Sequence, residues 1–180
     1  MYKRPIPATI EIKQSLAQDL PAIRVDRALF EATILNLVIN ARDAMEDGGE
    51  ILFATSQIDI DATMTDPQMG RLPPGRYVRI VVEDTGPGIP PELLPRVFEP
   101  FFSTKKFGAG HGMGLSMVRG FAEQSGGIAR IDPETGVGTS VELYFPALGS
   151  DISAGNDPDT QTAPALVERK TILVVEDNPN

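Results

Sequence analysis

Glycine and proline concentrate in one quarter of this chain, and their clustering limits what the chain can fold into. The 180 residues include 17 Gly and 16 Pro, and 15 of these 33 lie between residues 70 and 114. A disordered chain would be rich in both residues without apolar periodicity, whereas apolar residues recur regularly on both sides of this cluster. We therefore expect a long, specialised loop inside a folded domain.

The segment before the cluster predicts a helix between two strands. Residues 9–13 alternate like a half-buried strand, and a second strand is expected at about 50–57. Asp26 is a plausible N-cap for a helix that runs to about Met45. Residues 58–75 are polar and punctuated by Gly and Pro, so we expect a loop there. The apolar stripe of the helix recurs at steps of three and four and consists of Phe30, Ile34, Leu37, Ala41 and Met45.

Residues 76–84 give the clearest strand. Alternate residues point to opposite faces of a strand, so Val78, Ile80 and Val82 share one face with Asp84. That face is apolar until its last member. A carboxylate buried without a partner is costly, so Asp84 at the end of this face is expected to have one.

The segment from residue 91 onward predicts two helical pieces and two strands. A short helical piece is expected around 91–97, and a longer helix from Gly114 to about Gln124. Two strands follow at 127–132 and 139–145. Strands and helices in this order predict an α+β fold.

Three patterns of polar and glycine residues carry the chemistry. Asn36 and Asn40 are four residues apart on the first helix, so they share a face, to which Asp43 adds. Asp84 begins an Asp-Thr-Gly-Pro-Gly segment, where the carboxylate can accept a hydrogen bond from an exocyclic amine while the glycines allow a ring to approach. Alternating glycines over 108–114 expose backbone N–H groups at a helix start, which favours an anion. Each pattern alone also has an ordinary reading as a polar helix face, an Asx turn or a flexible loop.

Composition excludes several classes of function. The formal net charge is −9, which argues against a nucleic-acid partner. The chain has no cysteine, so disulfides and thiolate metal sites are excluded. No apolar run approaches the roughly 20 residues of a membrane span, and the first residues lack the apolar core of a signal peptide. We expect a cytoplasmic location and no membrane contact by this part of the protein.

Five segments in a fixed order resemble the ATP-binding catalytic domain of sensor histidine kinases, in the GHKL superfamily. They are LNLVINARDAM (35–45), DTGPGI (84–89), FEPFFSTK (98–105), GAGHGMGLSMV (108–118) and GVGTSVELYFP (136–146). This resemblance implies a Bergerat-type fold, which is a two-layer α/β sandwich with a mixed, mostly antiparallel sheet, helices on one face and a long ATP lid. It also implies ATP and Mg²⁺ as cofactors.

The resemblance assigns roles by position. Asn40 would coordinate Mg²⁺, and Asp84 would read the adenine amino group between Gly86 and Gly88. Residues 90–113 would form the lid. The N–H groups of Gly110, Gly112 and Gly114 would bind phosphates, and the pocket would also include Ile89, His111, Met113, Leu115 and Thr139.

Some of these residues have more than one interpretation. Lys105 either reaches the phosphates or forms a solvated basic pair with Lys106. Asp43 stands where many histidine kinases have Lys, so it holds water or Mg²⁺, or it solvates the helix. The three phenylalanines of 98–105 are expected to anchor the lid by packing, and core filling is the simpler account of all three, Phe98, Phe101 and Phe102.

Position 36 separates the members of the superfamily. Its ATP-hydrolysing members have a glutamate here that activates water, whereas this chain has Asn36. An amide cannot take a proton at neutral pH, so water activation should be poor. His111 is the only histidine and lies in a glycine loop, so we interpret it as a lid residue and not as the phosphate acceptor.

The resemblance covers residues 1–146 and predicts a protein-histidine kinase catalytic domain that donates the γ-phosphate of ATP to a histidine. That histidine would lie on a dimerisation domain of the same protein, which is absent from this chain. Residues 147–169 read as a flexible linker, and 170–180 resemble the first strand of a receiver domain, so the parent would be a hybrid kinase of a two-component system. The isolated domain is expected to be monomeric and the parent a homodimer. A GHKL-type ATPase and a non-catalytic nucleotide-binding regulatory module remain alternatives.

Overall fold

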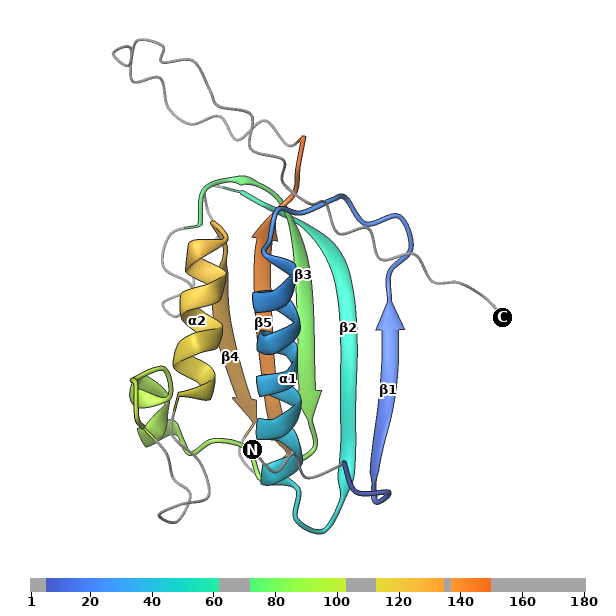
Figure 1. Ribbon diagram of the computed structural model, residues 1–180, viewed down its shortest axis with the longest axis vertical. Helices are drawn as coiled ribbons and strands as arrows, with labels where there is room; N and C mark the ends of the chain where they lie inside the picture. The colour runs from blue at the N-terminus through green and yellow to red at the C-terminus, as the bar shows by residue number, and fades with distance from the viewer. Residues whose placement is uncertain (1–5, 62–71, 103–112, 135–136, 150–180) are drawn as a thin grey trace.

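The computed structural model describes residues 6–61, 72–102, 113–134 and 137–149. Within these ranges the chain forms a sheet, two α-helices and a short 3₁₀ helix (Figure 1). In chain order the elements are β1 (Ile10–Leu16), α1 (Arg27–Ala44), β2 (Gly49–Ile60), β3 (Gly75–Asp84), η1 (Pro91–Arg96), α2 (Gly114–Gln124), β4 (Ile128–Glu134) and β5 (Gly138–Pro146).

The sheet is mixed and mostly antiparallel, as predicted. Its strand order is β1-β2-β3-β5-β4. β1 and β2 are parallel, and the other three neighbouring pairs are antiparallel. Both α-helices lie on the same face of the sheet, with α1 in front of its middle and α2 in front of β4 (Figure 1). The fold is therefore the expected two-layer sandwich.

The apolar residues that recur along α1 pack into the core between the helices and the sheet. Asp26 caps this helix by accepting a hydrogen bond from the Leu29 N–H at 2.9 Å, so the helix begins where the sequence predicts. Leu37, Ala41 and Met45 are buried against the sheet. The ring of Phe121 on α2 joins the two layers, since its centroid lies 6.3 Å from that of Phe30 and 5.7 Å from that of Phe145.

Two strand predictions differ from the structure. β1 is not half-buried, because it lies at the sheet edge beside the helices and not beneath them. Only Ile10 is buried, and Ile12 and Leu16 are about half exposed. β2 runs three residues beyond the predicted end, because Ile58 to Ile60 pair with the first residues of β3. The loop predicted for 58–75 therefore begins later.

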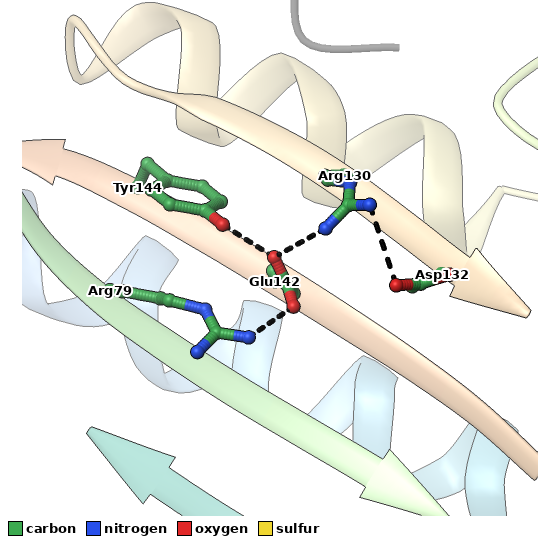
Figure 2. Close-up of polar contacts among 5 residues, drawn as sticks. All are labelled: Arg79, Arg130, Asp132, Glu142 and Tyr144. Atoms are coloured by element: carbon green, nitrogen blue, oxygen red, sulfur yellow. Dashed lines mark hydrogen bonds and ion pairs between the residues drawn. The ribbon is translucent and has the colours of Figure 1, made fainter. Parts of the chain in front are cut away.

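The outer face of the sheet, opposite the helices, holds a buried polar network that sequence reasoning did not identify (Figure 2). The Glu142 side chain is only 3% exposed. Its carboxylate accepts hydrogen bonds from Arg79 on β3, from Arg130 on β4 and from the Tyr144 hydroxyl. Arg130 also pairs with Asp132 at 3.4 Å. Three neighbouring strands are thus joined through one carboxylate.

The segment that follows β5 still contacts the sandwich. Ala147 is buried and forms an isolated bridge with Ile23, and the Leu148 N–H donates to the Ala22 carbonyl at 2.7 Å. Residues 150–169 of the predicted linker and the receiver-like strand lie outside the described residues. Among the described helices, none is long and apolar enough to span a membrane.

Candidate nucleotide-binding site

The ends of two helices and one strand lie together at one end of the sandwich. The C-terminal end of α1, the C-terminal end of β3 and the N-terminal end of α2 all lie at the lower end of the molecule in Figure 1. They carry Asn40, Asp84 and Gly114, which the sequence assigned to one ligand. The topology therefore brings to one end of the sandwich residues that are up to 74 positions apart in the sequence.

Asp84 is the last residue of β3 and is 8% exposed. Its Oδ1 accepts the Gly86 N–H at 2.9 Å, and the Thr139 backbone N–H also donates to this carboxylate. Burial raises the pKa of Asp84, and the two backbone donors oppose that shift. The site therefore holds a carboxylate in fixed orientation, with acceptor capacity beyond these two bonds.

Two glycines shape the turn after Asp84. A Cβ on Gly86 would lie 2.8 Å from Asp84 Oδ1 and 3.3 Å from the Ala44 Cβ, so a side chain there would displace the carboxylate. Gly88 has a φ of +75°, which a residue with a side chain adopts only with strain. Ile89 follows, half-buried and packed against the core.

Asn40 lies against the start of α2. A Cβ on Gly114 would lie 3.1 Å from Asn40 Nδ2 and 3.4 Å from its Oδ1. Asn36 is half-buried on the same face of α1. The amide of Asn40 is thus next to the helix end whose N–H groups and dipole favour an anion.

Asp43 pairs with a neighbour on its own helix. Its Oδ1 accepts from Arg42 Nε at 2.9 Å and from Arg42 Nη2 at 2.7 Å. Both side chains are largely buried, at 25% and 14% exposed respectively. No role was assigned to Arg42 from the sequence. Its position next to Asp43, with the opposite charge, was the only sign in the sequence that the two would pair.

The segment after β3 is anchored at two of its three phenylalanines. Phe98 and Phe102 pack against the core, and they lie beneath the guanidinium groups of Arg119 and Arg96, at 5.5 Å and 4.6 Å. The expectation for Phe101 is wrong. Its side chain is 77% exposed and its φ is +66°, because the turn after η1 directs it to the surface.

The remaining predicted site residues fall into two groups. Met113 is 40% exposed just before α2, Leu115 packs against the core and Thr139 is half-buried beside Asp84. The others lie outside the described residues, and they are Lys105, Gly110, His111 and Gly112.

Sequence comparison defines the class of protein. Residues 25–149 match the profile of the family described as histidine kinase-, DNA gyrase B- and HSP90-like ATPases. The match covers more than half of the chain, and it contains Asn40, Asp84 and Gly114. The chain belongs to this family.

Individual relatives narrow the class. The chain is 39% identical to the sensor kinase CckA of Brucella abortus (strain 2308) over 98% of its own length, which is 19% of that relative. It is 34% identical to the sensory histidine kinase/phosphatase NtrB of Rhizobium leguminosarum bv. phaseoli over 77% of this chain and 35% of that one. The chain therefore spans about a fifth to a third of these curated relatives.

Solved structures agree with the fold. The mycobacterial sensor histidine kinase MprB is 26% identical with a TM-score of 0.58, over 78% of this chain and 83% of that chain. Full-length ShkA in complex with AMPPNP is 30% identical with a TM-score of 0.59, over 77% of this chain and 26% of that chain. The chain has the fold of histidine kinase catalytic domains.

Proposed function

We propose that this chain is the ATP-binding catalytic domain of a two-component sensor histidine kinase. It would donate the γ-phosphate of ATP to a histidine on a dimerisation domain of the same protein. The observation that carries the proposal is the meeting of Asp84, Asn40 and the start of α2 at one end of a sandwich of this family.

The adenine base would bind beside Asp84, and the phosphates would bind at the start of α2. The carboxylate of Asp84 accepts a hydrogen bond from the 6-amino group of adenine, and Gly86 leaves room for the ring beside it. The N-terminus of α2 attracts the phosphates. Phosphoryl transfer needs mainly positioning and charge neutralisation, so these residues act by orienting the nucleotide.

The residues present fit a magnesium ion that is held largely by the nucleotide. The described residues contain no cluster of three or more His, Cys, Asp or Glu side chains able to hold a metal. Mg²⁺ bound to a nucleotide usually has only one or two protein ligands together with phosphate oxygens. Asn40, beside the start of α2, would supply such an oxygen, and the ion would neutralise phosphate charge.

Asn36 favours phosphoryl transfer over ATP hydrolysis. It shares a face of α1 with Asn40, so it lies near the proposed phosphate site. Its amide cannot accept a proton from water at neutral pH. Water would therefore be a poor nucleophile here, and the nucleotide would persist until an acceptor imidazole arrives.

The proposed partners are those that the resemblance to sensor histidine kinases implies. The acceptor histidine would belong to a dimerisation domain of the same protein, and the phosphate would pass on to a receiver domain. This domain would be monomeric and cytoplasmic, while the parent protein, either soluble or anchored to a membrane, would be a homodimer.

Phosphotransfer in trans tests the proposal. The chain is mixed with a purified dimer of acceptor helices from a related kinase and with γ-labelled ATP. We expect label on the acceptor that is stable to base and labile to acid, together with little phosphate release by the chain alone. Nucleotide binding without phosphohistidine would support a regulatory module, and steady ATP turnover would support an ATPase. Either result would overturn the kinase proposal.

A further inference from the structure

Thr85, between Asp84 and Gly86, is held by three contacts. Its backbone N–H donates to the Glu50 carbonyl at 3.2 Å, and its Oγ1 accepts the Glu50 N–H at 2.9 Å. Both polar backbone groups of one β2 residue are therefore paired with Thr85. This extends the β2–β3 ladder one position beyond its last pair, Ile51 and Asp84.

The third contact joins Thr85 to the end of α1. Its hydroxyl donates to Met45 Sδ at 3.6 Å, and Met45 is 4% exposed. A Cβ on Gly49 would lie 2.7 Å from Thr85 Oγ1 and 2.5 Å from Met45 Sδ. The Thr85 hydroxyl thus lies beside both Met45 and Gly49, and a side chain at position 49 would displace it.

The anchoring of Thr85 controls the next peptide. The N–H that holds Asp84 Oδ1 belongs to Gly86, which follows Thr85 directly. Rotation of the peptide between these two residues would turn that N–H away from the carboxylate. The hydroxyl of Thr85 opposes such a rotation, because it ties the residue to two other elements.

We propose that Thr85 is a positioning residue that orients the Asp84 carboxylate toward the 6-amino group of a purine. This inference rests on the proposed function. A fixed carboxylate accepts a hydrogen bond from that amino group, whereas one that rotates loses the bond but still admits the ring. Thr85 therefore contributes to recognition of the amino group, and not to binding of the purine or the phosphates.

A comparison of two nucleotides on the full chain tests this inference. ATP carries the 6-amino group, and purine riboside triphosphate lacks it. Thr85→Val removes the hydroxyl and keeps the shape. We expect it to weaken ATP binding by about three- to tenfold, the range of one net hydrogen bond, and to leave the affinity for purine riboside triphosphate within about twofold. Thr85→Ser keeps the hydroxyl and should restore ATP affinity.

Thr55 provides the matched control. Its Oγ1 accepts the Ala17 N–H at 3.0 Å on the same strand as Glu50 but at a distance from the site, so Thr55→Val should change neither affinity. If Thr85→Val does not fold, Thr85→Ala removes the hydroxyl with less steric demand. Equal weakening of both nucleotides, or no change in either, would overturn the inference. Failure of the wild-type chain to bind ATP would instead overturn the proposed function.

Discussion

Asp84 has a cost for folding that its proposed ligand would offset. Burial raises its pKa, so the native state holds a proton more tightly than the unfolded chain does. The stability associated with this group is therefore present below its unfolded pKa and is lost as the pH rises through the folded value. At neutral pH the ionised carboxylate lowers the stability of the nucleotide-free fold.

Asp84→Asn should separate binding from stability. Asparagine keeps the shape without a charge, but its oxygen can no longer serve both the backbone donors and an adenine amine. We expect ATP binding to be lost, while the melting temperature at pH 7 without nucleotide falls by no more than about 4 °C, the equivalent of roughly 1 kcal/mol. Calorimetry of nucleotide binding and thermal unfolding measure both. A large fall in melting temperature would mean that Asp84 is primarily structural.

Glu142 shows the opposite balance. Burial alone would raise its pKa, but the hydrogen bonds from Arg79 and Tyr144 and the charge of Arg130 outweigh burial and lower it. Burial and the bond to Glu142 raise the pKa of Tyr144 to about 12. The stability from Glu142 is therefore present above its unfolded pKa and is lost as the pH falls through its folded value.

Glu142→Gln should lower the free energy of unfolding at pH 7 by about 1–3 kcal/mol, because it removes charge-assisted bonds from a buried position. The difference from wild type should shrink as the pH falls below about 4.5, the ordinary range of a glutamate. Denaturant unfolding at both pH values measures this. Glu83→Gln, at an exposed position of β3, is the control. A difference that does not depend on pH would contradict the assigned ionisation.

At the scale of elements, α1 and α2 were predictable because their signals are local. Asp26 caps α1, apolar residues recur with helical spacing, and α2 begins and ends where glycines stand. The exposure of β1 was not predictable, because alternation does not tell which strand will lie at an edge beside the helices. Phe101 points to the surface because its own φ is positive in a turn, and nothing in the sequence marks that conformation.

The contact between α2 and Asn40 gives a prediction about both helices. Gly114→Ala places a Cβ about 3.1 Å from Asn40 Nδ2, so the amide must shift by a few tenths of an ångström. We expect weaker binding of Mg²⁺–ATP by several fold, with stability unchanged or slightly higher, since alanine is a better helix former than glycine.

Gly120 on the same helix is the matched control, since a Cβ there meets nothing within 4 Å. Gly120→Ala should raise stability by up to about 1 kcal/mol and leave affinity unchanged. Titration with Mg²⁺–ATP compares the two variants. Equal affinities for both would show that the position of Asn40 does not matter for binding.

At the scale of the whole molecule, the two faces of the sheet have different roles. The helix-covered face forms the apolar core, and the proposed nucleotide site lies at one end of it. The outer face is fixed by the Glu142 network, which joins residues of three strands and pairs Glu142 with Arg79, 63 positions earlier in the chain. Such a network is invisible in a single sequence, because strand order and register decide which charged residues meet. The ordered motifs, by contrast, predicted a set of site residues from the sequence alone, and Asn40, Asp84 and Gly114 of that set lie at one end of the sandwich.

A crystal structure of this chain with Mg²⁺ and a non-hydrolysable ATP analogue tests the central claim most directly. We expect the adenine 6-amino group to lie within hydrogen-bond distance of the Asp84 carboxylate, with the phosphates at the start of α2 beside Asn40. An analogue bound elsewhere, or bound here without a contact between its amino group and Asp84, would contradict it.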